Sequence, residues 1–162
     1  MTRYALPERP PAVQLWSGLD RVYTMLSRNL SAELAQFDLT TPQFRVLRQI
    51  ADQPRSSGDV AERIGVTAGN LTGIVDRLEQ EGLLSRERGD DRRSVHLTLT
   101  PAGGALLERT VPHMHRHIQG VFSPLDTDEL GRTLEVLARL ETHLSAPPRT
   151  VLGPVAESEV GA

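Results

Sequence analysis

Four arginines gather in one short stretch of the sequence, at Arg86, Arg88, Arg92 and Arg93. A guanidinium group binds phosphate or guanine through two parallel hydrogen bonds, so these side chains are suited to contacts with nucleic acid. All 18 cationic residues are arginine, yet the net charge is −3, so a nucleic-acid surface has to come from a local cluster. Asp91 is placed to hold Arg93 or Arg86 by a charge-assisted hydrogen bond. A solvated turn of mixed charge is the alternative interpretation.

The segment before this cluster carries small and polar residues on one helical face. Leucine, isoleucine and valine fall at helical spacing between residues 71 and 78, and the small or polar residues lie opposite them. Two glycines lower the stability of such a helix by about 1 kcal/mol each relative to alanine, but their small size allows the helix to enter the major groove of DNA closely. Asn70, Thr72 and Arg77 are then able to reach base edges or phosphates. An ordinary surface helix of weak propensity is the alternative.

Local signals place these residues within three short helices and a hairpin. Thr41, which a proline follows, predicts the start of the first helix, and Ser56 opens a second that ends at Gly65. Thr67 caps the third helix, which ends at Gly82 because glycine tolerates the left-handed conformation. These positions predict two short helices joined by a tight turn, the arrangement of a helix-turn-helix.

After Gly82 the apolar period changes from helical to alternating. Val95, Leu97 and Leu99 alternate with polar residues and follow a turn signal at 89–91, which predicts an antiparallel hairpin. The four arginines 86, 88, 92 and 93 are expected at its charged tip. Residues 41–100 are therefore expected to form a winged helix-turn-helix that binds DNA. The candidate DNA-contacting residues are Ser56, Thr67, Ala68, Gly69, Asn70, Thr72, Gly73, Arg77, Arg86, Arg88, Asp91, Arg92 and Arg93.

Long helices are expected on either side of this domain. The first, over residues 12–37, is about 25 residues or roughly 37 Å long, which exceeds what one small domain covers. Residues 101–145 predict two more helices, of which the first should be kinked or split at Pro112. Residues 1–11 are expected to form an irregular arm, and residues 146–162 a mobile tail.

A run of specific residues links the hairpin to a known family. It comprises Gly82-Leu83-Leu84, Arg86, Asp91-x-Arg93, Leu97-x-Leu99-Thr100 and Gly103, and it is preceded by the matching run Thr41–Leu47. This pattern resembles the MarR family of bacterial transcriptional regulators. The resemblance implies a mainly α fold with a small β-hairpin wing (α+β), in which the N- and C-terminal helices of two subunits interlock as dimerisation helices. It also implies double-stranded DNA as the partner, and a pocket between the dimerisation helices and the winged domain for a small aromatic acid.

The candidates for such a pocket are Trp16, Arg21, Phe44 and His113. In similar proteins an arginine of the first helix meets a carboxylate ligand, and Arg21 takes that position; a surface or dimer-interface arginine is the alternative. His113 and His117 share a helical face, which is acceptable spacing for a metal. A zinc-responsive regulator is therefore an alternative, although no matching cluster of further ligands accompanies them, and no metal site is assigned.

Other function classes are excluded by what the sequence lacks. It contains no cysteine, which rules out disulfides and thiol-based sensing. Nucleotide-binding and hydrolase motifs are absent, so neither an enzyme nor a cofactor is expected. No apolar run is long enough to span a membrane, and a cytoplasmic protein is expected. The sequence thus predicts a homodimeric repressor that binds a pseudo-palindromic operator and is released by an anionic aromatic ligand; a winged-helix adaptor for other proteins is a further alternative.

Overall fold

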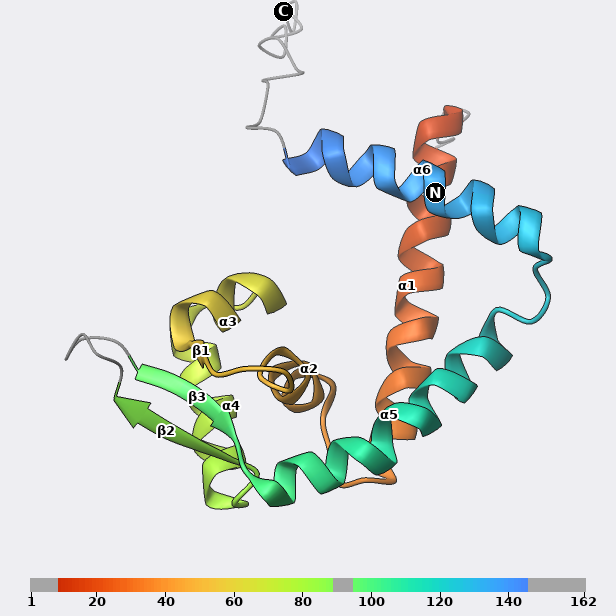
Figure 1. The fold of residues 1–162 in the computed structure, drawn as a ribbon. Coiled ribbons are helices and arrows are strands. Elements are labelled where there is room, and N and C mark those ends of the chain that lie inside the picture. Colours follow the sequence, from red (N-terminus) through yellow and green to blue (C-terminus); the bar gives the residue numbers. More distant parts are fainter. Residues whose placement is uncertain (1–8, 89–94, 146–162) are drawn as a thin grey trace, which may run out of the picture. The chain divides into compact units, whose positions relative to one another are not determined.

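The computed structural model of the chain describes residues 9–88 and 95–145. Within them the chain forms six helices and three strands (Figure 1). They are α1 (Pro11–Ala35), α2 (Thr41–Gln49), β1 (Arg55–Ser56), α3 (Ser57–Ile64), α4 (Ala68–Gln80), β2 (Leu84–Arg88), β3 (Val95–Leu99), α5 (Pro101–Val121) and α6 (Thr127–Ser145). Most of the N-terminal arm, the wing tip with Asp91, Arg92 and Arg93, and the C-terminal tail lie outside the described residues. The chain divides into two compact units, residues 1–119 and 120–162.

The helices α2, α3 and α4 pack together, and α4 also contacts β2. Each contributes an apolar face because its apolar residues recur at intervals of three and four. The faces share one core, in which Val46, Leu47, Val60, Leu78 and Leu97 are fully buried. The mainly helical winged helix-turn-helix that the sequence predicts is confirmed.

The wing belongs to a three-stranded antiparallel sheet with the order β1–β3–β2. The predicted hairpin is present, with Leu84 opposite Leu99 and Arg86 opposite Leu97. The third strand, β1, was not predicted, because two residues are too few to show an alternating pattern. Leu97 is buried and Leu99 packs against the core, as expected for the inner face of the wing, whereas Val95 is 40% exposed.

The helix ends follow the predicted caps with one correction. Ser56 and Thr67 accept hydrogen bonds from the backbone N–H three residues later, so both cap their helices. Thr40, not Thr41, caps α2: its hydroxyl accepts the N–H of Gln43, whose side chain accepts the N–H of Thr40 in return. Because Gln43 returns a hydrogen bond to the N–H of Thr40, the capping residue is Thr40 and not Thr41.

Tight turns close α3 and α4 at glycines. Gly65 and Gly82 have φ values of 70° and 69°, in the left-handed region that glycine adopts without strain. Both predicted helix ends are therefore confirmed.

The start of α5 lies against the turn between α4 and β2. The Thr100 hydroxyl donates to the carbonyl of Gly82 at 2.7 Å, and the Thr100 N–H donates to the carbonyl of Leu83 at 3.2 Å. Gly103 is buried there, and a Cβ on it would lie 2.1 Å from the Leu83 carbonyl oxygen. This close approach joins α5 directly to the end of α4.

The helix α5 continues through Pro112 without being split. The proline ring removes one backbone donor, and the carbonyl left without it belongs to Glu108, four residues earlier. Glu108 is exposed, so water can take the place of the missing donor. Of the two expected effects of Pro112, a kink or a split, the split is therefore wrong.

Two helices leave large apolar side chains in solvent. In α1 only Leu34 is buried, while Trp16 is 72% and Leu15 is 56% exposed. In α6 no residue is buried, and Leu134 and Leu144 are 65% and 77% exposed. A capping box begins α6, since the backbone N–H of Asp126 and that of Glu129 each donate to the carboxylate of the other residue. No helix in the described part of the chain is long and apolar enough to cross a membrane.

Candidate nucleic-acid interface

The helix α4 presents the small and polar face that the sequence predicts. Its inner side buries Leu71, Val75 and Leu78. The candidate contact residues on its outer side are all exposed: Ala68, Gly69, Asn70, Thr72, Gly73 and Arg77. A Cβ added at Gly69 or Gly73 would meet nothing within 4 Å. The outer face is therefore open to a large partner such as a DNA groove.

Three of these residues share a surface groove of about 470 Å³ between α2 and α4. Asn70, Gly73 and Arg77 line it from α4, and Pro42 and Gln43 line it from α2. The buried Gln43 is fixed by its bonds to Thr40, so the α2 wall of the groove has a defined shape. The groove brings together an amide and a guanidinium, which are the two groups that read adenine and guanine.

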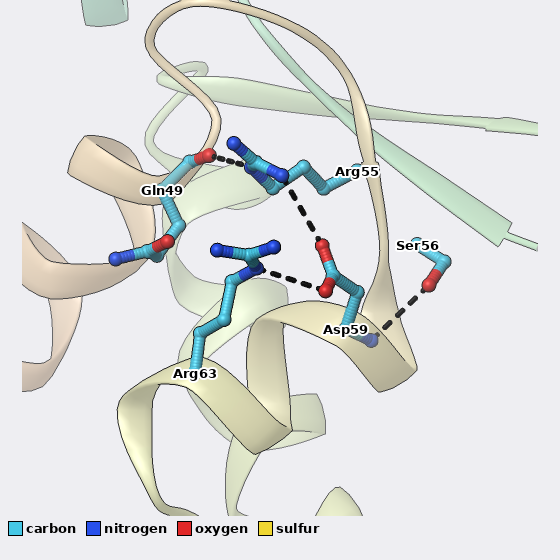
Figure 2. Close-up of polar contacts among 5 residues, drawn as sticks. All are labelled: Gln49, Arg55, Ser56, Asp59 and Arg63. Carbon is cyan, nitrogen blue, oxygen red and sulfur yellow. Dashed lines mark hydrogen bonds and ion pairs between the residues drawn. The ribbon is translucent and has the colours of Figure 1, made fainter.

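The start of α3 is held by a polar cluster around Asp59 (Figure 2). The Asp59 N–H donates to the Ser56 hydroxyl, and its carboxylate accepts from Arg63 at 2.8 Å and from Arg55 at 3.4 Å. Arg55 also donates to the carbonyl of Gln49 at 2.6 Å. The cluster thus joins the end of α2, β1 and the first turn of α3, where the candidate contact residue Ser56 lies.

The cluster holds the pKa of Asp59 below its ordinary value of 3.8, first because Arg63 donates a hydrogen bond to the carboxylate and then because Arg55 adds a second. A lowered pKa in the folded chain means that ionised Asp59 stabilises the fold above the ordinary pKa, and that this contribution is lost as the pH falls through the lowered value. The spacing of Asp59 and Arg63 was visible in the sequence, whereas the contact from Arg55 to Gln49 was not.

Replacing Asp59 with asparagine is expected to lower the melting temperature at neutral pH by a modest amount, because both partners are partly exposed to solvent. The difference from wild type should shrink as the pH falls below 3.8, because Asp59 of the unfolded wild-type chain is protonated there first and Asp59 of the folded chain follows at its lowered pKa. Thermal unfolding followed by circular dichroism between pH 7 and pH 3 measures it, with Glu62→Gln on the same helix as control. A deficit that stays constant down to pH 3 would contradict the role assigned to the Asp59 charge.

Arg86 is held within the protein by two carboxylates of α4. It lies in the middle of β2, opposite Leu97, and not at the wing tip where the sequence analysis placed it. Its guanidinium pairs with Asp76 at 2.5 Å and with Glu79. The paired carboxylates raise its pKa despite the desolvation that opposes this. Of the other wing candidates, Arg88 ends β2, and Asp91, Arg92 and Arg93 lie outside the described residues.

A second polar cluster joins α1 to α5. His113 Nε2 lies 2.7 Å from the carboxylate of Glu33, and His117 Nδ1 lies 3.7 Å from it. The hydrogen bond from His113 is the main cause that lowers the pKa of Glu33. The ring of Phe37 meets the ring of His113 edge-on, with centroids 5.1 Å apart. Across residues 9–88 and 95–145, no group of three or more histidine, aspartate or glutamate side chains is arranged to hold a metal ion.

The four candidate ligand-pocket residues are not brought together within one chain. Trp16 and Arg21 lie on exposed positions of α1, whereas Phe44 packs against the core and His113 contacts Glu33. Arg21 precedes Glu33 by three turns of the helix, which separates them by about 18 Å along its axis. A pocket that uses Arg21 together with His113 would have to be completed by something other than this chain alone.

Comparison with known proteins shows which proteins this chain is similar to in sequence and in fold. The sequence model of the MarR family matches residues 37–94. An uncharacterised HTH-type transcriptional regulator of Bacillus cereus is 36% identical over 132 residues, which cover 80% of this chain and 88% of that protein. The HTH-type transcriptional regulator PecS of Dickeya dadantii is 31% identical over 131 residues, with 78% and 79% covered. The solved structure of Bordetella bronchiseptica BpsR, whose DNA binding is regulated by 6-hydroxynicotinic acid, has a TM-score of 0.72 at 30% identity and covers 79% of this chain and 98% of its own.

Proposed function

This chain belongs to the MarR family of DNA-binding transcriptional regulators, and from that premise we propose that it is a cytoplasmic homodimeric repressor released from its operator by a small anionic aromatic acid. Its relatives are transcriptional regulators and not enzymes, in agreement with the lack of catalytic motifs. Repression is the simplest outcome for a dimer that covers a promoter, because it blocks access of the polymerase.

The exposed face of α4 is the observation that carries the DNA-reading part of this proposal. Its glycines leave room for a groove wall, and one of them, Gly73, lines a surface groove together with Asn70 and Arg77. Asn70 and Arg77 are assigned base or phosphate contacts, and the exposed Thr72 extends the same face. Arg88, Arg92 and Arg93 are assigned to the backbone or minor groove beside the half-site, where a narrow groove attracts arginine.

Footprinting tests the proposal. A two-fold dimer requires an operator whose half-sites form an inverted repeat, with centres about one helical turn or 34–36 Å apart. DNase protection of the intergenic DNA beside the coding region should reveal such a repeat. Protection of a direct repeat, or of a single isolated half-site, would contradict two-fold docking.

The salt dependence of the affinity for DNA tests the alternative of a protein-binding adaptor. If this affinity showed no salt dependence, the adaptor would be favoured, because only phosphate contacts release counterions.

The dimer rests on the apolar side chains that α1 and α6 leave exposed. Large apolar patches of this kind mark interaction surfaces, and a second copy offers the same two helices in return. Analytical ultracentrifugation at low micromolar concentration should give about twice the chain mass of 17.8 kDa. A stable, folded monomer at that concentration would refute the assignment of these helices.

Ligand-induced release is supported by BpsR, whose DNA binding responds to 6-hydroxynicotinic acid. A tenfold loss of operator affinity needs a differential affinity of about 1.4 kcal/mol between the two states of the protein. Titration of the operator complex with 6-hydroxynicotinic acid and with salicylate, followed by mobility shift, checks this part; if neither acid weakens binding, release by aromatic acids of this kind is excluded. A zinc-responsive regulator has less support, because Glu33, His113 and His117 do not form a metal-holding group in the described residues.

A further inference from the structure

The ion pairs of Arg86 connect the two parts of the domain that meet DNA. Asp76 and Glu79 are one turn apart on α4, and both reach the same guanidinium in the middle of β2. We infer that Arg86 is a positioning residue, which fixes the wing sheet at one angle to the recognition helix α4 and does not itself contact DNA. This inference rests on the proposed function, since it assigns α4 and the wing to one half-site.

Apolar packing alone does not set that angle. Leu78 of α4 and Leu84 of β2 are buried in the shared core, so the sheet stays against the helix without any ion pair. Burial of apolar surface is not directional, however, and tolerates a small rotation of one element on the other. A guanidinium that spans two carboxylates has a fixed planar geometry, so it resists such a rotation.

The angle matters because the two DNA-contacting elements enter neighbouring grooves. If α4 occupies the major groove, the arginines beyond β2 reach the flanking minor groove only when the wing holds one direction. A preformed angle removes the need to order the wing during binding, which raises the affinity for the operator. Random DNA, bound chiefly through its phosphates, depends less on that angle.

Arg86 is poorly placed to contact DNA directly. Its side chain is 30% exposed, and its guanidinium already binds Asp76 and Glu79. A phosphate would have to displace two carboxylates to reach it, and these would then lie unpaired beside a polyanion. By contrast, Arg77 is exposed in the groove between α2 and α4, and it is assigned a direct contact with DNA.

Variants that remove either Arg86 or its two carboxylate partners distinguish a positioning role of Arg86 from a direct contact with DNA. Arg86→Ala and the double variant Asp76→Asn/Glu79→Gln should both reduce operator affinity by about tenfold relative to random DNA, with an unchanged salt slope. Arg77→Ala should lower the slope by about one unit per subunit, and Glu62→Gln, a carboxylate variant away from Arg86, should behave as wild type. If the double variant keeps or gains operator specificity while Arg86→Ala loses it together with salt slope, Arg86 is a DNA contact and the inference is wrong.

A measurement without DNA keeps the inference testable if the proposed function fails. The chain has no cysteine, so spin labels can be placed at Thr72→Cys on α4 and Glu87→Cys on β2. With excess unlabelled chain to suppress distances between subunits, the label-to-label distribution should broaden in both the Arg86 and the double-carboxylate variants. Circular dichroism confirms that each variant remains folded. An unchanged distribution in both would overturn the positioning role, whatever the protein binds.

Discussion

Replacing Gly103 with alanine is expected to destabilise the protein by about 3 kcal/mol, at the upper end of the range for overpacked cores. The added Cβ would lie 2.1 Å from the carbonyl oxygen of Leu83 and 2.8 Å from a methyl carbon of Leu99. The Leu83 carbonyl is backbone and accepts the N–H of Thr100, so it cannot move aside without breaking that bond. We expect α5 to shift away from the end of α4 or the domain to unfold at lower temperature.

Gly104→Ala is the matched control, since it adds the same methyl group one residue along the same helix. A Cβ at Gly104 meets only a methyl carbon of Leu99, at an ordinary 3.9 Å. Alanine is the better helix former by about 1 kcal/mol, so this variant should equal or exceed wild type in stability. Urea denaturation of the three proteins measures the difference. Equal midpoints for the two alanine variants would show that the approach of Gly103 to Leu83 does not limit stability.

Replacing Gly73 with phenylalanine is expected to abolish sequence-specific DNA binding and leave the fold intact. A Cβ at residue 73 would meet no other part of the protein within 4 Å, and phenylalanine is a better helix former than glycine. The ring would project from the exposed face of α4 beside Asn70 and Arg77, where the proposed contact with the major groove is made. We expect operator affinity to fall to the level of random DNA, a loss of about 10³-fold or more.

Gly73→Ala is the matched control, because it distinguishes the effect of the size of the phenylalanine ring from the effect of higher helix propensity. It raises helix propensity as phenylalanine does but adds a single methyl group, so it should retain much of the operator affinity. Melting temperatures of both variants should match or exceed that of wild type. If Gly73→Phe still discriminates the operator from random DNA, then the recognition face lies elsewhere on the domain.

Helix ends could be predicted because their signals are local in sequence. The caps at Ser56 and Thr67, and the left-handed glycines 65 and 82, each depend on residues within one turn. The cap of α2 was assigned one residue too late because two threonines stand side by side. Only the bond that returns from Gln43 distinguishes Thr40 from Thr41.

The types of residue in the candidate site could be predicted from the sequence, but the side chains with which they pair could not. The exposed face of α4 follows from helical periodicity, and the structure exposes it as expected. The ion pairs of Arg86 could not be predicted because its partners Asp76 and Glu79 lie on another element, and helix and strand meet only in three dimensions. Glu33 and His113 are 80 residues apart in sequence, so no spacing rule could pair them.

The helix α6 has no buried residue of its own, and this has a consequence for how the protein behaves at low concentration. Most of the stability of a helix in a protein comes from the packing of its apolar face, so the order of this 19-residue helix has to come from whatever covers it. In the proposed dimer that cover is the partner subunit, and folding of this segment is then coupled to association. Dilution would yield chains with a frayed C-terminal helix open to proteases. The cell would thereby clear unassembled subunits. While most chains are unassembled, the amount of active dimer would vary with the square of the chain concentration.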